Sequence, residues 1–288
     1  MASGDIAPPV VVGYDGSKQG ERALRWGVEE ARHRWTSLVI CHAWHWPYPM
    51  PPSEPAMLQT VQDIGRHVLD QGVYVATGMA PGLPVRTRLI AGPASAALVS
   101  ESQGARLVVL GTRGLGGFDQ LRVGATAMQV SAHAACPVIV VSGAGCQWSC
   151  SPPLVVAGVD GSPAGFAAVG FAAEEAALRE GSLLAVCAGL SAAPPTEEPL
   201  DSTPDPDLRA KIEGPVWSAL SLWRERYPRV RMDASFVATP PRQALRDAGA
   251  NACLLVVGDR GIETDRPPLG PVTQAMLHHA PCPVAVVR

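Results

Sequence analysis

The sequence is poor in charged residues and has no excess of either sign that would attract a polyanion. Asp, Glu, Lys and Arg make up 17% of its 288 residues, and the formal net charge is −3. No stretch gathers Lys and Arg into a basic stripe, and such a stripe is the electrostatic footprint of nucleic-acid binding. We therefore expect no nucleic-acid partner.

Long apolar runs and targeting signals are also missing. No apolar segment approaches the roughly 20 residues that a helix needs to cross a bilayer, although hydrophobic residues reach 47% of the chain. The opening residues, MASGDIAPP, have neither the cationic start nor the apolar core of a secretory signal. The cysteines are odd in number and lie mostly in apolar runs, as reduced thiols do. These features predict a cytoplasmic protein without membrane contact.

Metal-binding patterns are weak. Cys146 and Cys150 are separated by three residues in CQWSC, with no second ligand pair nearby in the sequence. His133, His278 and His279 fall near the ends of expected helices, where a cation interacts favourably with the helix dipole. We interpret the cysteine segment as a plain linker and the histidines as structural, and we expect no metal.

The chain contains a tandem duplication, which is the most informative feature present. VVVGYDGS at residues 10–17 returns as VVAGVDGS at 155–162, LVVLGTRG at 107–114 as LLVVGDRG at 254–261, and HAACPVIVV near residue 133 as HHAPCPVAVV near residue 279. The blocks keep their order. This repetition predicts one domain at residues 1–142, a linker at 143–153 and a second domain at 154–288.

Within the first copy, short β-branched runs alternate with amphipathic segments. The expected strands are Val10–Tyr14, Leu38–Ala43, Val85–Ile90, Leu107–Leu110 and Val138–Val141, and the expected helices follow Ser17, span 56–77 and 93–102, and end at His133. Such alternation predicts an α/β fold: two tandem doubly wound domains, each a mainly parallel five-stranded sheet with helices on both faces. Ligands of such sheets bind beyond the carboxyl ends of the strands, where Asp15 and Gly111 would lie.

A glycine-rich loop follows the fourth expected strand of the first copy. In GTRGLGGFDQLRVGATAMQV, Gly111, Gly114 and Gly124 have the spacing G-x2-G-x9-G, and Gly124 precedes a helical pattern. Free N–H groups at a helix start suit a polyphosphate. The loop carries neither the P-loop motif nor the dinucleotide fingerprint.

Taken together, the strand-DGS-helix start, GTRG followed by a distant glycine, and HAACPVIVV resemble the universal stress protein family, in particular its tandem-domain type common in actinobacteria. The resemblance covers essentially the whole chain. It implies a five-stranded parallel α/β domain that holds ATP in the nucleotide-binding members. It also implies pairing of domains or protomers through the last strands, Val138–Val141 and Val284–Val287, and hence a homodimer.

The resemblance places Gly13 and Asp15 at the adenosine end, and the three loop glycines with the residue after them at the phosphates. With the flanking Arg113 and the neighbouring Thr126, the candidate first site is Gly13, Asp15, Gly111, Arg113, Gly114, Gly124, Ala125 and Thr126. The corresponding residues of the second copy are Gly158, Asp160, Gly258, Gly261 and Gly270. We expect ATP, with or without Mg, as the cofactor.

The two copies depart from the family pattern to different degrees. ATP-binding members usually carry Ser or Thr directly after the third glycine, where this chain has Ala125. In the second copy the glycine spacing is one residue shorter and Pro271, which has no N–H, follows Gly270. The first loop has Arg113 and Arg122 against Asp119, and the second has Asp259, Glu263 and Asp265 against Arg260 and Arg266. We therefore expect the second copy to be a degenerate site.

Several residues have two interpretations at this point. Asp15 could contact a ligand or form a turn with the next glycine; the resemblance favours contact, and for Asp160 both interpretations stay open. Ser17 and Ser162 are expected to be helix N-caps and not nucleophiles. The aromatic cluster of Trp44, Trp46 and Tyr48 either lies beside the adenine or covers the sheet edge.

The sequence shows no set of acid, base and nucleophile that would support turnover, so we expect no enzyme activity. The first hypothesis is an ATP-binding stress-response sensor or regulator without rapid turnover. The alternative is a dimeric interaction module of the same fold that binds no nucleotide and has no cofactor. A nucleotide-dependent enzyme, such as an adenylating ligase or an electron-transfer flavoprotein relative, lacks its own motifs here.

Overall fold

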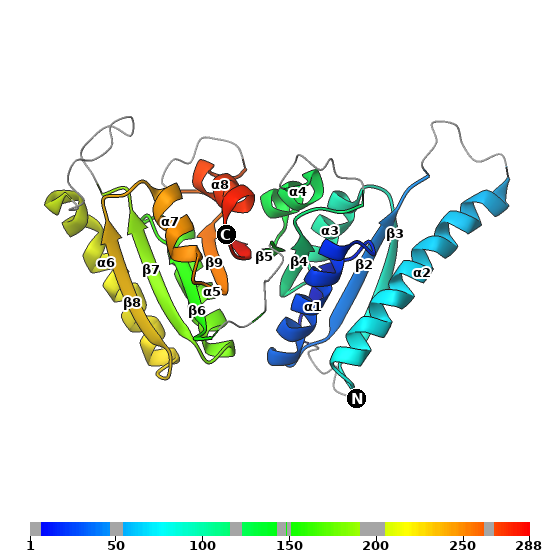
Figure 1. The fold of residues 1–288 in the computed structure, drawn as a ribbon, viewed down its shortest axis with the longest axis horizontal. Coiled ribbons are helices and arrows are strands. Elements are labelled where there is room, and N and C mark those ends of the chain that lie inside the picture. Colours follow the sequence, from blue (N-terminus) through cyan, green and yellow to red (C-terminus); the bar gives the residue numbers. More distant parts are fainter. Residues whose placement is uncertain are drawn as a thin grey trace. The chain divides into compact units, whose positions relative to one another are not determined.

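The computed structural model describes residues 7–46, 54–115, 123–142, 148, 151–190, 205–261 and 268–288. The chain divides into two compact units, Met1–Val141 (unit 1) and Ser142–Arg288 (unit 2). Figure 1 labels their helices and strands. Among the described residues, no helix combines the length and hydropathy needed to cross a bilayer.

Unit 1 alternates strands and helices along the chain. Its strands pair in the order β3-β2-β1-β4-β5, and every strand pair within the unit is parallel. The order reverses between β1 and β4, which makes the carboxyl ends of these strands the switch point of the sheet. The elements are β1 (Val10–Gly13), α1 (Lys18–His33), β2 (Leu38–Trp44), α2 (Pro55–Met79), β3 (Val85–Ala91), α3 (Ala94–Ser102), β4 (Leu107–Gly111), α4 (Ala125–His133) and β5 (Val138–Val141).

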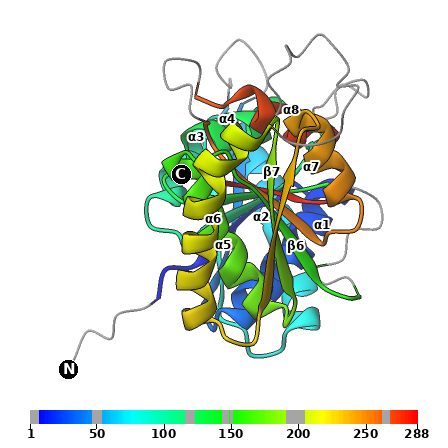
Figure 2. The same ribbon diagram turned by 90° about the vertical axis from the view of Figure 1, so that its left-hand side faces the viewer.

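Unit 2 repeats this arrangement with the strand order β8-β7-β6-β9-β10, again parallel throughout. In Figure 2 its helices α5 and α6 cover one face of the sheet and α7 lies on the other. The elements are β6 (Leu154–Gly158), α5 (Pro163–Leu178), β7 (Ser182–Ala188), α6 (Pro206–Arg226), β8 (Arg231–Val237), α7 (Pro241–Gly249), β9 (Leu254–Gly258), α8 (Pro271–His279) and β10 (Val284–Val287).

The central strands form where β-branched runs are buried on both faces. Val10, Val11 and Val12 of β1 are at most 1% exposed, as expected for a parallel strand covered by helices. Ser17 caps α1 through its Oγ, which accepts a hydrogen bond of 3.0 Å from the Gly20 N–H. Ser162 caps α5 in the same way through the Gly165 N–H. The N-cap interpretation of both serines is confirmed.

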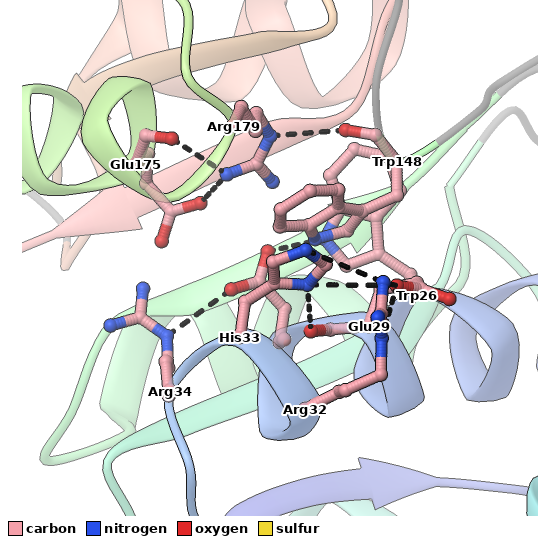
Figure 3. A network of polar contacts seen from close by, with 9 residues as sticks. Trp26, Glu29, Arg32, His33, Arg34, Trp148, Glu175 and Arg179 are labelled. Atoms are coloured by element: carbon pink, nitrogen blue, oxygen red, sulfur yellow. Dashed lines mark hydrogen bonds and ion pairs between the residues drawn. The ribbon is translucent and has the colours of Figure 1, made fainter. Parts of the chain in front are cut away.

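A buried ion pair lies at the C-terminal end of α5, and its arginine also contacts the segment before β6. The side chains of Glu175 and Arg179 are fully buried and form an ion pair, shown in Figure 3. The Arg179 guanidinium also donates a 3.0 Å hydrogen bond to the Trp148 carbonyl and lies 4.2 Å from the centre of its ring. In unit 1, Arg34 pairs with the buried Glu30 at the equivalent helix end. The duplication therefore extends to polar groups of the core.

The predicted elements are confirmed, with small differences at their ends. The strand expected at 10–14 ends at Gly13, although the Tyr14 N–H still donates to the Cys41 carbonyl of β2 over 2.9 Å. The helix expected at 56–77 runs from Pro55 to Met79. His133, His278 and His279 lie in the last turns of α4 and α8 as expected. Cys146, Cys150 and Tyr48 lie outside the described residues.

Candidate functional site

A cavity of about 320 Å³ (the unit 1 cavity) opens where the carboxyl ends of β1, β2 and β4 meet the first turns of α3 and α4. It lies at the point where the strand order reverses, which is where ligands of open α/β sheets bind. The structure brings every candidate residue of the first copy to its wall: Gly13, Asp15, Gly111, Arg113, Gly114, Gly124, Ala125 and Thr126.

Asp15 connects the end of β1 to the loop after β4. One carboxylate oxygen accepts a 3.0 Å hydrogen bond from the Ser17 N–H, and the other accepts one of 2.8 Å from the Leu115 N–H. The first contact is the local turn that the DG dipeptide predicts, and the second joins segments far apart in the sequence. The turn interpretation of Asp15 is therefore realised, and its contact with a ligand stays a prediction.

Three of the predicted glycines are closely packed within the protein, and at Gly111 the neighbouring atoms are backbone. A Cβ on Gly13 would lie 2.5 Å from Leu110 Cδ2, one on Gly111 would lie 2.7 Å from the Gln19 backbone, and one on Gly114 would collide with the Asp15 carboxylate. These positions lack a side chain because strand, helix and loop approach closely there. A substitution at Gly114 thus perturbs the protein itself and not a ligand contact alone.

Gly124 differs from these three glycines. A Cβ built on it meets nothing closer than the Thr112 carbonyl oxygen at 3.5 Å, which is ordinary contact. Its backbone, with φ −80° and ψ 160°, suits any residue. Among the described glycines of this loop, Gly124 is thus the one whose missing side chain leaves open space beside the cavity.

The N-terminus of α4 offers backbone donors to this cavity. Gly124 is the N-cap, and no side chain among the described residues caps the helix. The Gly124 N–H donates to the Thr112 carbonyl over 2.7 Å, which holds the helix start against the end of β4. The first N–H groups of a helix have no intrahelical acceptor and carry the positive end of its dipole. Ala125 and Thr126, which begin α4, line the cavity.

Sequence reasoning missed three side chains of the opposite wall, namely Tyr14, Cys41 and His42. The His42 ring donates from Nδ1 to the Tyr14 carbonyl over 2.8 Å, because a carbonyl can only accept. Burial, followed by the charges of Glu21 and Asp15, raises the pKa of the Tyr14 hydroxyl. Burial raises the pKa of the Cys41 thiol to about 12, so the thiol is neutral at pH 7. Their position in or directly after the carboxyl-terminal part of a strand was the signal available in the sequence.

The two described members of the aromatic cluster, Trp44 and Trp46, do not line this cavity. Trp44 ends β2, yet neither Trp44 nor Trp46 is among the described residues that line the cavity, where Ala43 takes the corresponding place. The third member, Tyr48, falls outside the described part of the chain. For the two described tryptophans, the contact with adenine and the cover of the sheet edge both stay predictions.

Unit 2 has a cavity at the equivalent place (the unit 2 cavity), with a volume of about 450 Å³. Its wall includes every candidate residue of the second copy: Gly158, Asp160, Gly258, Gly261 and Gly270. Pro271 occupies the first position of α8, so one backbone donor is absent. The unit 2 cavity is the larger of the two. A lack of volume therefore does not explain why unit 2 would bind nucleotide less well, and the expected difference lies in the chemistry of the walls.

A buried carboxylate lies at the end of β9 in unit 2, where unit 1 has Thr112. The side chain of Asp259 is 5% exposed, and Oδ2 is 3.4 Å from Nε of both Arg260 and Arg288. Arg260, the described cation of the unit 2 loop, is thus engaged by the protein. The remaining charges predicted to matter in this loop, Glu263, Asp265 and Arg266, lie outside the described residues.

Comparison with known proteins agrees with this architecture. Residues 8–142 and 154–288 each match the model of the universal stress protein family. A universal stress protein of Mycolicibacterium smegmatis is 29% identical over 296 aligned residues, which cover 97% of this chain and 96% of the relative. One from Mycobacterium tuberculosis is 32% identical over 295 residues, with the same coverage.

A solved structure shares the fold over the whole chain. The crystal structure of a universal stress protein from Archaeoglobus fulgidus superimposes with a TM-score of 0.72 at 14% identity, and covers 98% of both chains. This likeness confirms the fold, and the two family matches confirm the resemblance seen in the sequence motifs. The chain belongs to the universal stress protein family, as a member with two tandem domains.

Proposed function

We propose that unit 1 binds ATP, with or without Mg, and that the protein is a cytoplasmic stress-response sensor or regulator without rapid turnover. The observation that carries this proposal is the convergence of the predicted phosphate residues around the first turn of α4. Gly124, Ala125 and Thr126 line one end of the unit 1 cavity beside Arg113, and a helix N-terminus attracts phosphate. The family resemblance supplies the adenine nucleotide as the ligand.

The absence of turnover is part of the proposal. His42 is the one imidazole on the described wall, and its Nδ1 is engaged by the Tyr14 carbonyl. Asp15 uses both carboxylate oxygens for backbone N–H groups. The Nδ1 bond leaves Nε2 of His42 as the basic nitrogen of the ring, so this part of the proposal rests on the sequence, which pairs no nucleophile with a base. ATP incubated with the protein should remain intact over many minutes, as measured by phosphate release.

The direct test is to release and identify the nucleotide that accompanies the purified protein. Denaturation followed by chromatography and mass spectrometry should yield an adenine nucleotide, at no more than about one per chain. Protein that carries no nucleotide and binds no added ATP in calorimetry would contradict the proposal.

The alternative function is a dimeric interaction module without nucleotide. Ala125 favours it, because the residue that begins α4 offers no hydroxyl to a phosphate. Both functions include a homodimer formed through β5 and β10. Light scattering after gel filtration should give twice the chain mass. A monomer at micromolar concentration would exclude this part of both proposals.

A further inference from the structure

The walls of the two cavities differ in polarity at equivalent positions. The duplication aligns Tyr14 with Val159 and Thr126 with Val272, and all four residues line their cavities. At both positions a hydroxyl in unit 1 is replaced by an aliphatic side chain in unit 2. His42, on the wall of unit 1, has no counterpart among the described residues of the unit 2 wall.

The rest of the unit 2 wall is also mainly apolar. Its apolar side chains come from β7 and β9, from Val159 directly after β6, from the N-terminal halves of α7 and α8, and from the residue before the α8 cap. They are Val159, Val186, Ala188, Pro241, Leu245, Val257, Leu269, Pro271 and Val272.

The uncharged polar side chains of this wall are already used within the protein. Thr273 donates from Oγ1 to the Gly258 carbonyl over 2.6 Å, and Gln274 donates from Nε2 to the Leu269 carbonyl over 2.8 Å. These bonds leave fewer groups to hold a phosphate or sugar hydroxyl.

The charges around the unit 2 cavity disfavour an anion. Asp160 places a carboxylate on the wall, and its Oδ1 accepts from the N–H and Oγ of Ser162. Arg260, the one cation on the described part of the wall, is within 3.4 Å of the buried Asp259. Unit 1 also carries a wall carboxylate, Asp15, so the difference in unit 2 is an arginine already engaged by Asp259 and a proline in place of a backbone donor.

From this wall we propose that the unit 2 cavity binds an uncharged, largely apolar small molecule. The volume of about 450 Å³ falls within the range of small-molecule sites, which are mostly apolar with few polar groups. The two units then have different ligands, a charged nucleotide in unit 1 and a neutral apolar molecule in unit 2. The unit 2 site does not depend on whether unit 1 binds ATP.

Two dyes of one skeleton test the charge selectivity in the full chain. N-phenyl-1-naphthylamine is neutral, and 8-anilinonaphthalene-1-sulfonate adds one negative charge to the same ring system. Both fluoresce when they enter an apolar site. We expect saturable binding of the neutral dye, and at least about tenfold weaker binding of the sulfonate. Equal affinity for the two dyes, or no saturable binding of the neutral dye, would overturn the proposal.

A matched pair of variants locates the dye. Ala188 of β7 and Ala43 of β2 are equivalent in the duplication, line their respective cavities and are partly buried. Ala188→Phe should fill the unit 2 cavity and weaken binding of the neutral dye at least about tenfold. Ala43→Phe should leave that binding unchanged. The opposite pattern, or equal losses in both variants, would show that the dye does not select unit 2.

A second variant and a competition complete the test. Val272→Phe fills the same cavity from α8, so it should repeat the loss even if Ala188→Phe does not fold. Its counterpart Thr126→Phe should not affect the dye. Saturating ATP should leave the dye bound, and displacement by ATP would contradict a neutral site. Failure of ATP to bind anywhere would contradict the proposed function alone, since the dye reports on unit 2.

Discussion

Ala125 is the residue where the first copy departs from the pattern expected of nucleotide-binding members of the family. It begins α4 and lines the unit 1 cavity, where a hydroxyl could donate to a phosphate oxygen. We predict that Ala125→Ser tightens ATP binding about tenfold, equivalent to about 1.4 kcal/mol, and leaves adenosine binding unchanged. Calorimetry with both ligands separates the phosphate end from the base end. An equal gain for adenosine, or no gain for ATP, would contradict this role.

Cys41 gives a pH-dependent prediction at the same scale. Burial raises the pKa of its thiol from 9.0 to about 12, so the folded protein retains a proton that the unfolded chain releases. The stability that this thiol contributes is complete below pH 9 and is lost as the pH rises from 9 towards 12. Between pH 8 and pH 10, the wild-type free energy of unfolding should fall by about 1 kcal/mol more than that of Cys41→Ala. Urea unfolding at both pH values measures the difference, and parallel curves would contradict it.

At the scale of elements, Gly111 sets how closely β4 approaches α1. A Cβ at this position would lie 2.7 Å from the carbonyl carbon and oxygen of Gln19, and backbone atoms cannot move aside as a side-chain end can. We predict that Gly111→Ala destabilises unit 1 by about 1–3 kcal/mol. Gly78 of α2, which has nothing within 4 Å of a built Cβ, is the control, and Gly78→Ala should stabilise by about 0.5–1 kcal/mol. Urea unfolding without loss in Gly111→Ala would contradict the packing account.

The buried pair of Glu175 and Arg179 makes a second prediction for an element. Removal of the carboxylate leaves a guanidinium with no exposed side-chain surface and without its partner charge. Glu175→Ala should therefore destabilise unit 2 by about 3–5 kcal/mol. The exposed pair of Glu21 and Arg25 is the comparison, and Glu21→Ala should cost no more than about 1 kcal/mol. Similar losses in thermal or urea unfolding for the two variants would contradict the assigned role of burial.

For the whole molecule, the sequence carries the duplication, the alternation of strands and helices, and the positions that gather at each cavity. Local patterns decide these features, because β-branched runs form the buried strands and Ser17 caps its helix through a hydrogen bond three residues away. The contact from Asp15 to the Leu115 N–H spans 100 positions and depends on how β1 and the loop after β4 meet. No spacing in the sequence predicts such a contact.

The same limit explains why the sequence predicts the role of the loop glycines and the residues of the cavity walls only in part. Gly114 was expected to admit phosphate, but in the fold its Cα faces the Asp15 carboxylate. Tyr14 and His42 reach the unit 1 wall because β1 and β2 are neighbours in register. These features depend on tertiary packing, which short motifs do not encode.

The central claim is that unit 1, and not unit 2, holds ATP, and one calorimetric comparison tests it most directly. Gly124 and Gly270 are equivalent N-cap glycines that line their cavities, and a built Cβ on either meets nothing closer than 3.5 Å. Both alanine variants should therefore fold. We predict that the wild type and Gly270→Ala bind about one ATP per chain with equal affinity, and that Gly124→Ala binds at least about tenfold more weakly. Unchanged binding in Gly124→Ala together with loss in Gly270→Ala would contradict the account.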